Sequence, residues 1–406
     1  MQIYTGQIYR GPTIVPVCAR AARLSDPPGS RAWSGNALSP RLCSVEGGFR
    51  LVRENLMDRH RVRRLFNAAL AVSALLAAAA AHAQLSSFTL TDLGRVASNS
   101  RVAINDAGQA AGTFTLSDGS QRAFLYSGGT RMNLGTLPGH SSSAGFGINS
   151  HGDVTGSSDD SAFVFTSQTG MQPVSGLFPG AVGFGINDAG QVVGKHEVFG
   201  EVTAAFLHTP GIGQQSLGFA AAGSFAYAIN NAGQVTGTAF TNLDFEVFVA
   251  KADTPAVFIG LLGQGRAIND AGQVAGSGTV AFSGRPLSAF LHTPGVGTLE
   301  LGALSGDERS GAFGINDAGH VVGESFSDPS SPHAFLYTSQ AGMVGLQSLL
   351  DPVTGQGWSL GTAWDINNKG QIVGVGRFEG EEHAYLLTPS QCPAPRGLLA
   401  KLGRRS

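Results

Sequence analysis

The dipeptide Ile-Asn occurs seven times in this 406-residue chain, and each copy opens the same short pattern. Glycine follows the asparagine after three residues and again after a further four, and successive copies are 38 to 51 residues apart. The seven isoleucines stand at positions 104, 148, 186, 229, 268, 315 and 366. A repeat of this length is one supersecondary unit that cannot bury its apolar face alone, so the copies must stack on one another.

The copy at 186–194, Ile-Asn-Asp-Ala-Gly-Gln-Val-Val-Gly, reads as a strand, a tight turn and a second strand. Asn and Asp satisfy backbone groups in turns, and Gly accepts the positive φ that a three-residue hairpin with a G1 bulge requires. A calcium loop is the alternative, but its alternating carboxylates and terminal Glu are missing. The pattern therefore predicts structural turn roles for Asn105, Asn149, Asn187, Asn230, Asn269, Asn316 and Asn367.

Each unit continues with an aromatic strand such as Ala123-Phe124-Leu125-Tyr126 and with a strand ending in Leu-Gly or a similar pair. Four short strands in roughly 40–45 residues is the size of one propeller blade. The last unit lacks its fourth strand, whereas Phe88–Gly94 matches the fourth-strand pattern and has no partner. We therefore expect an all-β fold over residues 84–389, a seven-bladed β-propeller of four-stranded blades, closed by this N-terminal strand.

The first strand of each unit separates large from small residues. The residue two before the isoleucine is bulky, and those one and three before it are mostly Gly or Ala, so a large face of one blade could pack on the small face of the next. Three residues break the rule: Arg101 and Asp365 replace small residues, and Arg266 replaces an aromatic one. Closure would bring Arg101 towards Asp365, either as a ring-closing ion pair or as a polar ligand site at the channel mouth. These three are the candidate binding residues.

Sequence before the repeats predicts export. Residues 57–83 contain a basic stretch after Met57, an apolar run of 16 residues from Leu65 to Ala80 and the small-x-small site Ala81-His82-Ala83. This is the pattern of a secretory signal peptide, and the run is short for a membrane span of about 20 residues. We expect cleavage after Ala83, a periplasmic, extracellular or surface-associated protein, and no transmembrane segment in the mature chain. Residues 1–56 have no pattern of their own and are expected to be a disordered, non-native upstream extension; residues 390–406 form a basic tail.

Net charge and cysteine content limit the kinds of partner and the sources of stability that this chain can have. Between Gln84 and Pro389 there are 11 Lys and Arg against 24 Asp and Glu, a difference of −13, which disfavours nucleic acid or an anionic membrane. The third cysteine, Cys392, lies beyond the repeats, so the propeller has no internal disulfide and depends on its apolar core. We expect a monomer.

The repeats resemble the HAF repeats of bacterial extracellular proteins, a family named for a His-Ala-Phe motif. That motif stands here as His333-Ala334-Phe335 and, loosely, as His383-Ala384-Tyr385. The Ile-Asn-Asp-Ala-Gly-Gln-Val-Val-Gly segment is the other hallmark. The resemblance covers about residues 87–389 and implies a secreted or surface-associated propeller-like protein, without catalytic residues to carry over.

The sequence contains no nucleophile elbow, phosphate-binding loop or paired metal ligands, so no catalytic residue, metal or cofactor is predicted. The favoured hypothesis is a non-enzymatic protein that binds a glycan or an envelope protein, or serves as an envelope or matrix component. A glycan-active hydrolase or lyase that uses loop carboxylates such as Glu379, Glu381 and Glu382 is the alternative. A calcium-stabilised structural protein is the third.

Overall fold

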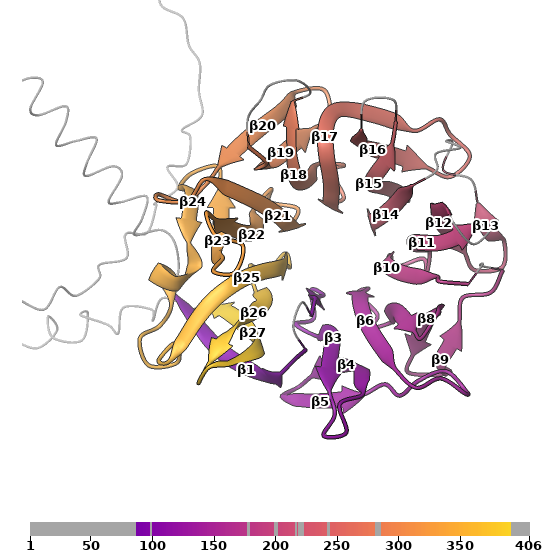
Figure 1. Cartoon of the computed structure of the whole chain (residues 1–406), viewed down its shortest axis with the longest axis horizontal. Coiled ribbons are helices and arrows are strands. Elements are labelled where there is room, and N and C mark those ends of the chain that lie inside the picture. The colour runs from indigo at the N-terminus through magenta and orange to yellow at the C-terminus, as the bar shows by residue number, and fades with distance from the viewer. Residues whose placement is uncertain are drawn as a thin grey trace, which may run out of the picture. The chain divides into compact units, whose positions relative to one another are not determined.

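The protein folds into a ring of antiparallel β-sheets that radiate from a central axis, which is the β-propeller fold (Figure 1). The computed structural model describes residues 87–390, with gaps at 98–99, 177–178, 199–201, 216, 218–222, 242–243 and 281–285. Its regular structure is all β, apart from one 3₁₀ turn, η1 (Leu346–Leu349), within these residues. The upstream extension, the signal peptide and the tail beyond Ser390 lie outside the described residues.

Five sheets contain four strands each. They are β2 (Val102–Ile104), β3 (Ala110–Thr115), β4 (Gln121–Ser127) and β5 (Thr130–Asn133); β6 (Ser143–Ile148), β7 (Val154–Ser158), β8 (Ser161–Thr166) and β9 (Gly170–Pro173); β10 (Val182–Ile186), β11 (Val192–Val198), β12 (Val202–Thr209) and β13 (Gly213–Gln215); β21 (Arg309–Ile315), β22 (Val321–Phe326), β23 (His333–Thr338) and β24 (Gly342–Gly345); and β25 (Trp358–Ile366), β26 (Ile372–Phe378), β27 (Glu381–Pro389) and β1 (Phe88–Arg95).

The sixth sheet has seven strands because one long strand belongs to two repeats. Strand β17 (Val257–Ile268) pairs through Val257, Phe258 and Leu262 with β16 and, from Leu261 to Ile268, with β18. The remaining strands of this sheet are β14 (Ser224–Ile229), β15 (Gln234–Phe240), β16 (Phe245–Lys251), β18 (Val274–Val280), β19 (Ser288–Thr293) and β20 (Gly297–Gly302). The chain therefore passes from one repeat to the next here without leaving the sheet.

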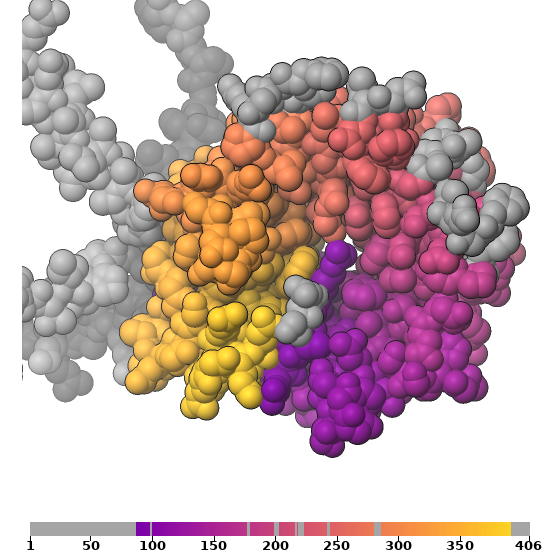
Figure 2. Space-filling model, in the orientation of Figure 1, coloured from indigo at the N-terminus to yellow at the C-terminus, as the bar shows by residue number. Residues whose placement is uncertain are grey.

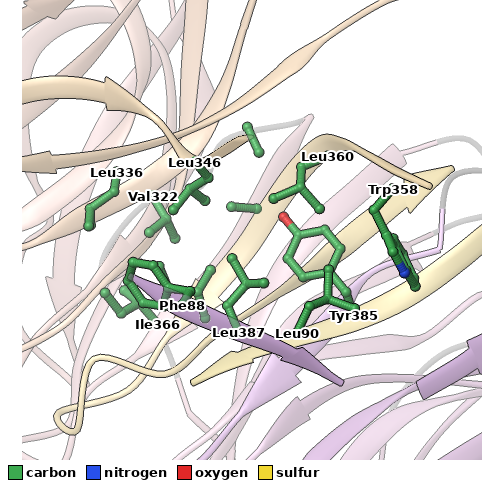
Figure 3. Close-up of a cluster of buried hydrophobic side chains, with 13 residues drawn as sticks. Phe88, Leu90, Val322, Leu336, Leu346, Trp358, Leu360, Ile366, Tyr385 and Leu387 are labelled. Carbon is green, nitrogen blue, oxygen red and sulfur yellow. The ribbon is translucent and has the colours of Figure 1, made fainter. Parts of the chain in front are cut away.

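Strand β1 comes first in the chain but pairs with β27, the last strand. The register runs antiparallel from Phe88 opposite Pro389 to Arg95 opposite His383. Phe88 and Leu90 are buried in an apolar cluster with Leu387 and Tyr385 of β27, as Figure 3 shows. The two ends of the propeller are thus joined by a backbone ladder and by a shared core.

Each Ile-Asn segment forms the expected hairpin. In the copy at 186–194, the amide of Asn187 donates to the carbonyl of Gln191 at 3.1 Å, and the amide of Gly190 donates back to Asn187 at 3.0 Å. Gly190 has a φ of 72°, a left-handed conformation that favours glycine. The first repeated glycine is therefore a requirement of the turn.

The second repeated glycine faces the aromatic residue of the third strand. Gly156 is the register partner of Phe163, and a Cβ on this glycine would lie 2.9 Å from the phenyl ring and overlap the carbonyl oxygen of Ala144. The aromatic side chains on these strands are almost fully buried: Phe124, Phe163, Phe206, Phe248, Phe290, Phe335 and Tyr385. Glycine opposite an aromatic ring is thus the packing unit of each blade core.

Candidate functional site

The innermost strands, from β2 to β25, surround a central channel that contains two cavities. One cavity, of about 200 Å³, is lined by the residues before the repeated isoleucines, and the other, of about 240 Å³, by the residues after them. Isoleucines from most repeats line both cavities and so form the boundary between them. The space-filling view in Figure 2 shows that side chains leave only a narrow hollow at the centre of the ring.

The seven repeat asparagines form a closed ring of hydrogen bonds at the second cavity. Each Nδ2 donates to the backbone carbonyl of the next asparagine, from Asn105 to Asn149 at 2.9 Å and so on around to Asn367, which donates to Asn105 at 2.9 Å. The other five bonds are 2.9 to 3.2 Å long. Each Oδ1 also accepts the amide four residues ahead, as between Asn187 and Gln191 at 3.0 Å. The asparagines thus close the turn and join neighbouring blades.

A second layer of contacts lies one residue further along. The amide of Asp188 donates to the side chain of Asn231 at 3.0 Å, and the amide of Asn231 donates to Asp270 at 2.9 Å. Four aspartates contribute to this layer: Asp106, Asp188, Asp270 and Asp317. This end of the channel is therefore acidic, and its carboxylates are engaged with the backbone of the neighbouring blade.

The opposite cavity is bordered by bulky side chains, which we call the collar. Its members are Val102, Phe146, Phe184, Tyr227, Arg266, Phe313 and Trp364. The rings contact one another around the channel, with Phe146 and Phe184 5.8 Å apart and Phe313 and Trp364 4.5 Å apart. The alternation of large and small residues predicts that these side chains pack on the small face of the next blade. They line the channel instead, because the inner strands approach too closely at the small positions, where a Cβ on Gly147 would lie 2.9 Å from the carbonyl of Phe184.

Arg101 lies across the collar. Its guanidinium carbon is 5.5 Å from the ring centres of both Phe184 and Trp364. Burial first, and the nearby charge of Arg266 second, lower its pKa from 12.5 to about 10. Among the described residues, its side chain has no hydrogen bond and no carboxylate partner. The suggested ion pair with Asp365 is therefore wrong, although both side chains line the same cavity.

Arg266 occupies the collar position that is aromatic in most repeats. Its guanidinium carbon lies 4.4 Å from the ring centre of Tyr227 and 5.9 Å from that of Phe313. The side chain donates to the amide oxygen of Gln264, whereas its buried Nε has no hydrogen-bond partner among the described residues. Burial lowers the pKa of Arg266, and the charge of Glu324 partly opposes this.

Asp365 connects the last inner strand to the first, but through a backbone amide and not through the predicted ion pair with Arg101. Its carboxylate accepts the backbone amide of Ile104 on β2 at 3.0 Å and its neighbour, Ile366, at 2.8 Å. Burial nevertheless dominates and raises the pKa of this carboxyl from 3.8 to about 7. Asp365 therefore supplies only part of a negative charge to the cavity near neutral pH.

A separate cavity of about 570 Å³ lies beside the collar, and its lining includes Arg101, Glu324, Trp364 and Glu382. Burial raises the pKa of Glu324, which accepts the hydroxyl of Thr362 at 2.7 Å. The buried Oε2 of Glu382 has no hydrogen-bond partner among the described residues. Two carboxyl groups in one cavity were not predicted as a pair from the sequence, which singled out Glu382 without Glu324.

The other two carboxylates considered for catalysis lie elsewhere. Glu381 forms a surface ion pair with Arg95 at 3.1 Å, and Glu379 is an exposed turn residue with a φ of 52°. In the part of the chain that the structure describes, no group of three or more His, Cys, Asp or Glu side chains is arranged to hold a metal ion. The same residues include no helix of the length and apolarity that crossing a bilayer requires.

Fold and site together define the class of protein: a β-propeller whose central channel has one regular, acidic end and one irregular end that carries two arginines. No family model and no curated protein sequence matches the chain.

Solved structures resemble it at low sequence identity. Virginiamycin B lyase from Staphylococcus aureus is 12% identical over 74% of this chain and 99% of its own, with a TM-score of 0.48. A puromycin-hydrolysing peptidase from Mycobacterium tuberculosis is 14% identical over 72% of this chain and 50% of its own, with a TM-score of 0.46. The β-propeller domain of the Trilobed protease from Pyrococcus furiosus is 9% identical over 75% and 96%, with a TM-score of 0.45.

Proposed function

We propose that this chain is an exported, non-enzymatic repeat protein of the HAF-repeat type, with a binding role at the cell envelope or in the extracellular matrix. The observation that carries the proposal is the collar cavity, where two arginines that form no ion pair with a carboxylate among the described residues interrupt an otherwise repeating channel. A buried charge costs stability unless it is paired and hydrogen-bonded, and residues that break a fold's local rules concentrate at functional sites. Export is supported by the signal-peptide pattern at 57–83, and the partner we favour is a glycan or an envelope protein.

We further propose that the ring has seven blades and is closed by β1. This count treats β17 as the outer strand of one blade and the inner strand of the next, so the seven-stranded sheet represents two blades. Seven asparagine bonds around the channel and the pairing of β1 with β27 support it. Closure by a terminal strand removes the exposed edges of an open sheet.

The decisive experiment expresses the full chain with a C-terminal tag in a secreting bacterial host. We expect the exported protein to begin at Gln84 and to be retained on envelope fractions or acidic glycan resin without releasing new reducing ends. A protein that stays in the cytoplasm with Met1 or Met57 at its N-terminus would contradict export. Exported protein that elutes from every resin and fraction like an inert control would contradict binding.

A glycan-active hydrolase remains the second candidate because one observation favours it. Glu324, with its raised pKa, and Glu382, with its unpartnered oxygen, line the cavity beside the collar as a catalytic acid and a second carboxylate would. Glycan turnover by the exported protein that disappears in both Glu324→Gln and Glu382→Gln would establish this activity. Turnover that survives both substitutions would exclude this cavity as its source.

A further inference from the structure

The collar cavity has the size of a single small ring. Its volume of about 200 Å³ is below the 300–1,000 Å³ typical of pockets for drug-sized ligands. Residues from all seven inner strands surround it, mostly with aromatic and aliphatic side chains, and the repeated isoleucines close it on the side of the asparagine ring. A ligand would therefore enter as one ring or as the end residue of a chain.

The cavity carries uncompensated positive charge. Arg101 has no carboxylate partner among the described residues, and the only hydrogen bond of the Arg266 side chain there is to neutral Gln264. Burial first, and the charge of Arg266 second, lower the pKa of Arg101. The nearest acids offset this incompletely, because Asp365 is bound to two backbone amides and Glu324 lies in the adjacent cavity.

Two hydrogen-bond donors at the collar also lack acceptors. The Nε of Arg266 and the indole Nε1 of Trp364 are both buried and have no partner within the described part of the chain. Buried donors of this kind are rare and call for an acceptor, and a carboxylate offers two oxygens with about four acceptor sites. An anion would satisfy the donors and relieve the repulsion at once.

The aromatic rings hold the guanidinium groups in place and provide flat surfaces. Arg101 is fixed between Phe184 and Trp364, and Arg266 lies against Tyr227, all within the 6 Å range of cation–π contacts. Faces of Trp and Tyr rings pack well on a flat or sugar ring, while the arginines present N–H groups to a charged substituent. The fold itself does not need Arg266, since five of the other six repeats fill its position with an aromatic residue and one with valine.

We propose that the collar cavity binds a carboxylate carried on one small ring, with the carboxylate between Arg101 and Arg266 and the ring against the collar aromatics. This inference deepens the binding role proposed above and rests on it. The ligand is either an acidic sugar, such as a uronic acid at the end of a glycan, or an aromatic acid, and both share this recognition chemistry.

The test uses the exported full chain and two pairs of probes. Galacturonate is compared with neutral galactose, and benzoate with benzyl alcohol, by isothermal titration calorimetry and by the fluorescence of Trp364. Trp364→Phe supplies the fluorescence background. We expect at least one acid to bind ten times more tightly than its neutral partner. Equal affinities within both pairs, or no saturable binding of either acid at about 10 mM, would overturn the proposal.

Variants then locate the site. Arg101→Gln and Arg266→Gln should each weaken acid binding at least tenfold while leaving the melting temperature close to that of the wild type. Arg309→Gln is the matched control, because Arg309 is exposed and does not line the cavity. An unchanged affinity in both collar variants, or an equal loss in the control, would place binding elsewhere and overturn the proposal.

These experiments distinguish an acidic sugar from an aromatic acid as the ligand, and the collar site from the envelope-binding role. Binding of galacturonate alone assigns an acidic sugar, binding of benzoate alone assigns an aromatic acid, and binding of both supports the shared chemistry. Retention on envelope fractions that is equal in wild type and in the Arg101→Gln/Arg266→Gln double variant would reject the collar while leaving the binding role intact. Acid binding without any retention would reject the envelope role and leave the collar intact.

Discussion

The two ends of the central channel are built from the same seven strands, yet they obey different rules. At one end all seven repeats supply asparagine, and each side chain makes the same bond to the next repeat. At the other end the repeats supply valine, phenylalanine, tyrosine, tryptophan and arginine, and Arg101 lies across the opening. Equivalent positions in a ring have equivalent neighbours. A residue that is the same in every repeat therefore indicates a structural role, and a residue that differs in one repeat indicates a role particular to that place.

The contrast extends to hydrogen bonding. Asparagine side chains at the regular end use their donors and acceptors within the ring, and all seven are buried. Donors at the collar, on Arg266 and Trp364, are buried and find no partner among the residues that the structure describes. A fold selected only for stability would avoid such groups, since each costs about 1–3 kcal/mol. We therefore expect stability to be concentrated at one end of the channel and the proposed binding at the other, and three predictions test this division.

The largest effect should come from breaking the asparagine ring. Asn187→Ala leaves the carbonyl of Asn230 and the amide of Gln191 without their side-chain partner, so we expect a loss of about 2–5 kcal/mol in the free energy of unfolding. Asn367→Ala should cost the same, because it removes the equivalent bond to Asn105 where the chain ends meet. Urea denaturation measures both.

Asn231→Ala is the control, since its side chain is exposed, accepts the amide of Asp188 at 3.0 Å and donates only a long bond of 3.3 Å to the exposed side chain of Asp270. It should change stability by less than about 1 kcal/mol. A small cost for Asn367→Ala beside a large one for Asn187→Ala would mean that the ring is open at that point in solution, contrary to the proposed closure.

The regular parts of the fold could be predicted from the sequence because the same local pattern of residues recurs in all seven repeats. Turn glycines such as Gly190 and core aromatics such as Phe163 follow from hairpin chemistry and period-2 alternation. The bonds between asparagines could not be derived that way, because they join residues 38 to 51 positions apart, or 262 across the closure, and depend on the spacing of the inner strands. Asparagine in every copy, where Asp or Ser would also serve a turn, was the available signal.

The candidate site was predicted in part. Arg101, Arg266 and Asp365 stood out as exceptions to the repeat, and the structure brings all three to one cavity. Their interactions were not predictable. The prediction of an ion pair between Arg101 and Asp365 considered only opposite charge, whereas the backbone amide of Ile104 competes for Asp365 and binds it. The collar was missed for a related reason: alternation separates large from small faces but does not say which face lines the channel.

An intermediate effect should come from Asp365, and it should depend on pH. Its folded pKa of about 7 lies above the unfolded value of 3.8, so the folded state holds its proton more tightly and loses stability as pH rises from about 4 to about 7. The limit is about 1.4 kcal/mol for each pH unit in this window. Asp365→Asn removes this dependence, and the variant should become more stable relative to wild type at pH 8 than at pH 5.

Other groups titrate in the same window and must be held constant. Burial lowers the pKa of His196, His208, His292 and His320, which makes stability fall as pH decreases, but the wild type and the variant share them. The charge of Asp106 acts on Asp365, and the other charged or titratable groups that line the same cavity are Arg101, Tyr227 and Arg266. Urea unfolding of both proteins at pH 5 and pH 8 isolates the carboxyl. Parallel pH profiles would show that Asp365 is ionised in the folded protein and that the cavity is less positive than inferred.

The smallest effect on stability should come from the two collar arginines. Arg101→Gln and Arg266→Gln each remove cation–π contacts, typically worth about 0.5–2 kcal/mol, but also remove the cost of burying a charge beside a like charge. We expect these terms to cancel within about 1 kcal/mol in urea denaturation. A loss as large as that of Asn187→Ala would make the arginines structural members of the ring. The irregular end of the channel would then differ from the regular end only in how it is stabilised, and the unpaired donors would no longer indicate a ligand.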